Sequence, residues 1–272
     1  MTATPSTLVR AFLATGALPL SRSISQVQGM LQREDYNACD LADYLRTDPT
    51  LTARVMAVAN SAFFSRQPCA AIEDAVNRLG TLQLTRIFAQ VLANASMIRP
   101  LAAYGLPADA IWHRSVATAV GAELAAGRQG EDRSAAYMVG LLHLVGMLVV
   151  DKLWLRQAGA GRLHHVDIDH EWTADERRLC GFDQATLGGE MLRQLGFPDS
   201  VVSTVGRQYR PPLTPTERTF YIGRLVRSSL CAEPHPNPDQ EVMREFRLVA
   251  ESQFEAFLAD VREEMQSMLS AV

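Results

Sequence analysis

The fold is decided by the stretch from Ile111 to Val150, IWHRSVATAVGAELAAGRQGEDRSAAYMVGLLHLVGMLVV. Apolar residues recur in it at spacings of three and four on both sides of the polar turn Gly127–Asp132. This spacing predicts two long helices, each with an apolar stripe that faces a shared core. Each predicted helix carries a histidine, His113 and His143, and facing helices that present histidines are one way in which all-helical proteins build metal sites.

Helix signals also dominate the rest of the chain. The dipeptide Asp48-Pro49 supplies an N-cap and a first-turn proline, so a helix is expected to begin there. Gly80 predicts a helix end, followed by a long apolar helix over Leu82–Met97. Two more helices are predicted over Pro215–Leu230 and Gln240–Leu269. We therefore expect an all-α fold, a compact bundle of many helices with additional C-terminal helices and no significant β-sheet.

Composition excludes several classes of function. The chain has 272 residues, is 47% hydrophobic and carries a formal charge of -4, so no global field draws it to nucleic acid or to an acidic membrane. The most apolar run, Met138–Val150, is too short to cross a bilayer, and the N-terminus lacks signal-peptide features. Four widely spaced cysteines without a CxxC motif are typical of a reducing compartment. We expect a cytoplasmic protein without membrane insertion, nucleic-acid binding or a cofactor.

Five short blocks occur in a fixed order along the chain. They are Asp48–Leu51 with Val58–Phe63, Ile72–Gly80, Trp112–Ser115, Gly140–Gly146, and Glu176–Gln184 with Gly196–Pro198. Through these blocks the sequence resembles the HDOD family, a bacterial relative of the metal-dependent HD and HD-GYP phosphohydrolases. The resemblance implies a compact helical domain that acts as a regulatory or output module in signal transduction. It divides the chain into an N-terminal helical lead-in (1–19), an HDOD domain (20–212) and a C-terminal helical extension (213–272) that packs on the domain or mediates contacts.

The resemblance also implies that the metal site of the HD enzymes is degenerate here. Those enzymes hold ions through imidazoles and carboxylates, and the ion generates hydroxide. The corresponding positions in this chain are Arg114, His143, Leu144, Gln184, Gln208, Tyr209 and Arg227. Only His143 keeps a ligand type, and one imidazole beside arginines cannot hold a catalytic ion. We expect no metal, no catalytic residues and no enzymatic activity.

Two groups of residues are candidate contacts for a ligand or a partner. The first is the pair Asn60-Ser61 at a predicted helix end, which could instead terminate the helix by bonding backbone groups. The second is a set of arginines that could form a basic pocket for a phosphate, because guanidinium forks match phosphate oxygens. Surface solvation and internal salt bridges are the alternatives for the arginines, which are Arg114, Arg207, Arg210 and Arg227.

A histidine-rich loop is a further candidate. The sequence His164-His165-Val166-Asp167-Ile168-Asp169-His170 supplies several ligand types for Zn²⁺, namely His164, His165, Asp167 and His170. No predicted helix fixes their geometry. A solvated loop or one that faces a partner is the alternative.

Three functions are consistent with these observations. The leading hypothesis is a non-enzymatic signalling module that acts through contacts with a protein partner of unknown identity, and a homodimer stays open. The second is a module that binds a nucleotide, such as a cyclic dinucleotide, in an arginine-lined vestigial cleft. The third is a residual metal-dependent phosphohydrolase.

Overall fold

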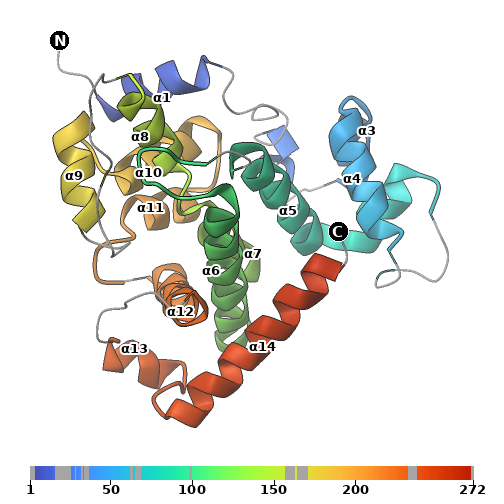
Figure 1. The fold of residues 1–272 in the computed structure, drawn as a ribbon. Helices are drawn as coiled ribbons and strands as arrows, with labels where there is room; N and C mark the ends of the chain where they lie inside the picture. Colours follow the sequence, from blue (N-terminus) through green and yellow to red (C-terminus); the bar gives the residue numbers. More distant parts are fainter. Residues whose placement is uncertain are drawn as a thin grey trace.

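The computed structural model describes residues 4–15, 26–27, 29–31, 33, 37–61, 64, 69–97, 100–156, 163, 171–212, 214–231 and 238–270. These residues form helices joined by short connections, as the sequence predicts (Figure 1). Within them there is no strand, and the isolated bridge between Leu101 and Leu106 is the one β-type pairing. The predicted all-α class is confirmed.

The helices follow one another along the chain and are listed here in order. They are α1 (Pro5–Leu13), α3 (Ala38–Arg46), α4 (Pro49–Ala59), α5 (Ile72–Met97), α6 (Ala108–Gln129), α7 (Arg133–Leu142), α8 (Gly146–Trp154), α9 (Glu171–Cys180), α10 (Gln184–Gln194), α11 (Asp199–Gly206), α12 (Pro215–Leu230), α13 (Gln240–Glu245) and α14 (Glu251–Ser270). Residues 26–27 and 29–31 are also helical.

Local capping explains where several helices begin. The Asp48 carboxylate accepts a hydrogen bond from the backbone N–H of Leu51, 3.1 Å away, at the start of α4. The Asp132 carboxylate accepts one from the N–H of Ala135, 3.0 Å away, at the start of α7. A capping box formed by Thr214 and Glu217 begins α12. Each bond satisfies a donor that would otherwise lack a partner in the first turn.

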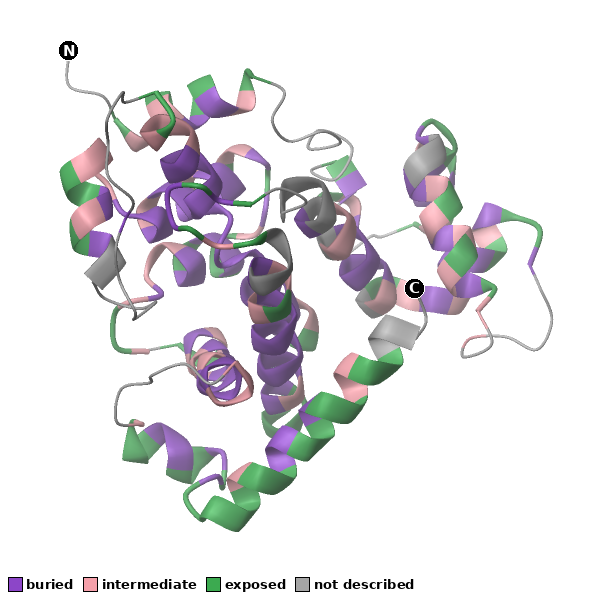
Figure 2. Cartoon of the chain, in the orientation of Figure 1, coloured by how far each residue is buried: buried purple, intermediate pink, exposed green. Residues whose placement is uncertain are grey.

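The buried apolar side chains form two large clusters. The main cluster gathers α6, α7, α8, α10, α11 and α12, and these helices are largely buried (Figure 2). The second cluster lies under α3, α4 and α5 from Ile72 to Phe88, on both sides of Gly80. Val91 on α5 packs against both clusters. Helix α5 therefore joins the two cores.

Gly80 divides α5 into the two predicted helices. Its φ of 67° and ψ of 173° are not helical and belong to a region that essentially glycine alone adopts. The prediction that Gly80 ends a helix is therefore confirmed.

Two long helices predicted from sequence are each broken in two. The second central helix ends at Leu142 and resumes at Gly146, and the backbone between them makes i→i−3 hydrogen bonds, such as Val145 N–H to Leu142 O at 3.1 Å. The C-terminal helix is broken between Glu245 and Glu251, where Arg247 has a positive φ of 55°. Apolar periodicity runs through both breaks, so it predicted continuous helices.

The stretch Arg133–Trp154 is long and apolar enough to cross a membrane by composition, with a mean hydropathy of 1.7. Its apolar window is 94% buried inside the fold. Contact with neighbouring helices therefore accounts for its hydropathy.

The C-terminal helices are part of the main core. Phe220, Ile222 and Val226 of α12 and Phe257 and Val261 of α14 are all buried in the main cluster. The outer face of α14 is exposed (Figure 2). The apolar face of the extension is therefore covered by the protein itself.

Candidate functional site

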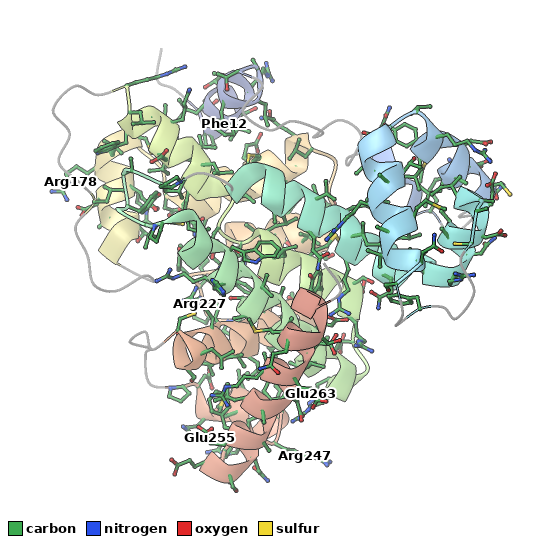
Figure 3. The ribbon with its side chains drawn as sticks, turned by 45° about the vertical axis from the view of Figure 1, so that its right-hand side comes forward. Phe12, Arg178, Arg227, Arg247, Glu255 and Glu263 are labelled. Carbon is green, nitrogen blue, oxygen red and sulfur yellow. The ribbon has the colours of Figure 1, made fainter. Side chains whose placement is uncertain are left out.

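A buried contact between Arg227 and His143 lies within the main core. His143 follows the last residue of α7, Arg227 lies in the last turn of α12, and each residue is 1% exposed. Arg227 Nη1 lies 3.3 Å from His143 Nε2. Figure 3 shows Arg227 on α12 beside the helices drawn in green. Two positions that the resemblance assigns to metal ligands, 84 residues apart, thus meet in the fold.

The hydrogen bonds of His143 define its protonation. His143 Nδ1 lies 2.7 Å from the carbonyl oxygen of Gly140, which can only accept, so Nδ1 carries the proton. A guanidinium can only donate, so Nε2 accepts from Arg227. His143 is therefore the neutral Nδ1–H tautomer, and the lone pair that would bind a metal ion is directed to Arg227. Phe220 packs edge-on against the imidazole, with ring centroids 5.4 Å apart.

Glutamine side chains join this contact to the surrounding helices. Gln208 Nε2 donates to the carbonyl oxygens of His143, at 3.0 Å, and Val205, at 3.1 Å. Gln184 Nε2 donates to the Tyr209 hydroxyl at 2.6 Å. Gln184 and Gln208 thus occupy positions where the resemblance implies histidines. Their hydrogen bonds connect the end of α7, the start of α10 and the end of α11.

Glu176 forms a second buried polar group beside Gln184. Its carboxylate accepts from the Tyr104 hydroxyl and from the backbone N–H of Gln184, each at 2.7 Å. Burial raises the pKa of Glu176 from its ordinary 4.5 to about 7, although both hydrogen bonds favour the charged form. Burial and the adjacent Glu176 carboxyl also raise the pKa of Tyr104 well above its ordinary value. This pair fixes α9 and the loop before α6 against the start of α10.

These residues do not fit a catalytic metal ion. A divalent ion needs several imidazole or carboxylate ligands, whereas the imidazole of His143 contacts the guanidinium of Arg227 and the carbonyl oxygen of Gly140. Leu144, at the position of the bridging aspartate, is 3% exposed within the apolar core. Among the described residues, no three His, Cys, Asp or Glu side chains are grouped so that they could hold a metal.

The four candidate arginines do not share one pocket. Arg227 is buried against His143, and Arg114 is half-buried on α6. Arg207 and Arg210 lie together at the end of α11, where both line an open surface depression with Arg224. Arg207 Nε also contacts Glu217 Oε1 at 3.1 Å. Of the four arginines, Arg207 and Arg210 share this depression, and Arg224, which the sequence did not single out, lines it with them.

Asn60 and Ser61 have structural contacts in the described residues. Asn60 Oδ1 accepts from the backbone N–H of Cys69 at 2.8 Å, and Asn60 Nδ2 donates to the Cys69 carbonyl at 3.1 Å. Ser61 Oγ donates to the Val58 carbonyl at 2.8 Å. These bonds support the alternative that the pair ends α4 and holds the following loop. The histidine-rich loop, with His164, His165, Asp167 and His170, lies outside the described residues.

Sequence reasoning missed two parts of the site. Arg224 follows Gly223 in an amphipathic helix and carries no local motif. The Tyr104–Glu176 bond spans 72 residues, and Tyr104 lies in a segment whose composition indicates only a linker. In the sequence, the one signal for this pair is that Glu176 lies inside the fifth block.

Comparison with known proteins places this arrangement in a family. Residues 18–211 match the HDOD domain, which covers more than half of the chain, and the protein belongs to the HDOD family. A search of curated proteins finds no match.

Solved structures share the fold at low sequence identity. A putative signal transduction protein from Marinobacter aquaeolei VT8 is 22% identical with a TM-score of 0.68, and the alignment covers 93% of this chain but only 59% of that protein. An HDOD domain protein of unknown function from Geobacter sulfurreducens is 24% identical with a TM-score of 0.61, covering 95% and 97% of the two chains. A putative phosphohydrolase from Shewanella amazonensis SB2B is 22% identical with a TM-score of 0.58, covering 93% and 91%. These likenesses show the fold alone.

Proposed function

We propose that this HDOD protein is a non-catalytic signal-transduction module that acts through a protein partner. One observation carries the proposal: Arg227 directs a guanidinium at the single imidazole, His143, that remains at the vestigial metal site. A buried positive charge at that place opposes a divalent ion, and the imidazole lone pair is already used. The description of the Marinobacter relative as a putative signal transduction protein is consistent with a signalling role.

The catalytic part of the proposal is tested by loading the protein with metal. The full chain is incubated separately with Mn²⁺, Fe²⁺, Zn²⁺ and Mg²⁺, desalted, analysed for bound metal and assayed for phosphomonoester and phosphodiester hydrolysis. We expect no stoichiometric metal at the His143 site and no turnover. Metal-dependent hydrolysis that disappears in His143→Ala would overturn the proposal.

The interaction part needs a separate experiment. The immobilised full chain is used to capture partners from an extract of its native cell, with and without a chelator. We expect a saturable partner whose binding is unaffected by the chelator and is repeated with purified components. A protein that captures no partner under conditions where it stays folded would contradict this part.

A further inference from the structure

Three arginines line one open depression between the end of α11 and the middle of α12. Arg207 is the C-cap residue of α11, Arg210 lies in the following turn, and Arg224 lies on α12. The depression itself holds only about 10 Å³, room for one water molecule, so the three guanidinium groups meet a ligand at its mouth. Glu217 is the one carboxylate among the described residues that line it. Three positive charges against one negative charge leave an excess of two on a protein whose net formal charge is -4.

Two of these arginines are held in place by the fold. Arg207 uses its Nε on Glu217, which leaves the outer nitrogens of its fork for other acceptors. Arg224 Nη1 donates to the backbone carbonyl of Gln208, and its guanidinium lies 5.5 Å from the centre of the Tyr209 ring. Arg210 is exposed, and its side chain makes no hydrogen bond or ion pair within the described part of the chain. The cluster therefore combines two oriented guanidinium groups with one exposed guanidinium group.

Helix capping explains only part of this cluster. Cations are favourable near a helix C-terminus, and α11 ends at Gly206, directly before Arg207. That effect falls off within the last turn, whereas Arg224 belongs to a different helix. Helix capping therefore does not account for the position of Arg224 beside Arg207 and Arg210.

We propose that this arginine depression binds a phosphate group of a small anionic ligand. Guanidinium forks pair with phosphate oxygens through short charge-assisted hydrogen bonds, and several such forks around one opening give a site for a doubly charged group. A phosphate group held by these forks lies at the mouth of the depression, so the rest of the ligand extends into solvent. The inference goes beyond the proposed function, because a non-catalytic module can carry this site or lack it.

Gln208 connects the arginine depression to His143 of the buried Arg227–His143 contact. Gln208 accepts from Arg224 through its backbone carbonyl and donates through its side chain to the carbonyl of His143. A phosphate that draws Arg224 outward would weaken its bond to Gln208. Ligand binding at the surface therefore acts on the residue that supports the Arg227–His143 contact.

The site is tested by calorimetric titration of the full chain at low ionic strength with inorganic phosphate, pyrophosphate and guanosine triphosphate. Arg210→Gln is expected to weaken binding about tenfold, because it removes one charge-assisted contact. Glu217→Gln is expected to tighten binding several-fold, because it removes the competing carboxylate while an amide can still complete the capping box. Arg244→Gln, an exposed arginine on α13, is the matched control and is expected to have no effect.

The probes also identify the source of the phosphate. Equal affinity for pyrophosphate and guanosine triphosphate assigns the recognition to the phosphate chain alone, and tighter binding of guanosine triphosphate assigns it to a nucleotide. Either result supports the site if Arg210→Gln is selectively impaired. Absence of binding by all three probes at millimolar concentration, or an equal loss in Arg210→Gln and Arg244→Gln, would overturn the proposal.

Discussion

At the residue scale, the centre of the molecule replaces metal coordination by hydrogen bonding. Arg227 is among the largest fully buried side chains of the described residues, and its partner His143 is neutral. Burying a charge is costly unless polar groups compensate it. The Arg227–His143 contact is therefore expected to matter for stability as well as for excluding an ion.

Truncation of this arginine should destabilise the fold. Arg227→Ala leaves a cavity and removes the donor for His143 Nε2, and we expect a loss of about 3 kcal/mol in the free energy of unfolding. Urea denaturation measures it. Arg244→Ala, which removes an exposed arginine, should change stability by less than about 0.5 kcal/mol. Equal effects of the two substitutions would show that the buried contact contributes nothing.

The raised pKa of Glu176 makes the stability of the fold depend on pH in a specific range. In the unfolded chain this carboxyl loses its proton near 4.5, whereas in the folded protein it keeps the proton up to about pH 7. Its contribution to stability is therefore complete below pH 4.5 and is lost as the pH rises to about 7. We expect Glu176→Gln to flatten the decline in stability over this window, measured by urea denaturation at a series of pH values.

An exposed glutamate supplies the control for that experiment. Glu255 lies on the exposed surface of α14 (Figure 3). Glu255→Gln should leave the pH profile parallel to that of the wild-type protein. A Glu176→Gln profile that also stays parallel to wild type would contradict the assignment of the decline to Glu176.

At the element scale, sequence predicted helices well and their interruptions poorly. Asp48 and Asp132 mark helix starts by chemistry that acts within one turn, and Gly80 marks an end by its backbone freedom. The break after Leu142 has no such local signal, since apolar residues continue on both sides of it. It depends on contact with α10, which lies 40 residues further along the chain.

Gly146 lies at the closest approach of α8 to α10. A Cβ atom at this position would lie 1.8 Å from the carbonyl oxygen of Gln184 on α10. Gly146→Ala must therefore separate α8 from α10, and we expect a loss of at least about 3 kcal/mol in the free energy of unfolding.

Gly127→Ala is the control, and it is expected to raise stability where Gly146→Ala lowers it. A Cβ atom there would meet the Arg133 side chain at an ordinary 3.5 Å, and the residue is in α6. Alanine favours a helix over glycine by up to about 1 kcal/mol, so Gly127→Ala should stabilise the protein. Thermal and urea unfolding of both variants test this, and similar effects of the two substitutions would contradict the packing argument.

The sequence predicted which residues belong to the candidate site. It did not predict which of these residues contact one another. Motif order identified His143, Gln184, Gln208 and Arg227, because each stands beside residues of a recognisable block or helix. Which of them touch depends on how α7, α11 and α12 cross, and no local pattern specifies that crossing. Arg114, placed in the same pocket from sequence, is half-buried on α6 and does not line the depression of Arg207 and Arg210.

At the scale of the whole molecule, a buried ionic network ties four helices together. Glu123 on α6 is 1% exposed and contacts Arg86 on α5 at 2.6 Å and Arg133 of α7 at 3.2 Å. Arg86 also contacts Glu264 on α14 at 3.2 Å. Burial raises the pKa of Glu123, and the two arginines oppose that rise. The network fixes the C-terminal helix to the main core.

Two truncations distinguish the roles of the C-terminal helices. Removing 251–272 deletes α14 with buried Phe257, Leu258 and Val261, which should cost about 5 kcal/mol and leave a less stable but cooperative fold. Removing 213–272 also deletes α12 and Arg227, and we expect no cooperative unfolding transition. Circular dichroism with thermal melting measures both, and a cooperative melt of the shorter chain would show that residues 4–212 fold without α12.

The separate apolar cluster under α3 and α4 has a consequence for the order in which the protein opens. The second apolar cluster contains fewer buried residues than the main one, and Val91 on α5 packs against both. Units of this kind open at lower free energy than the global fold. Amide hydrogens of α3 and α4 should therefore exchange with deuterium as a cooperative group, ahead of those of α6 and α7, while the core around His143 stays closed.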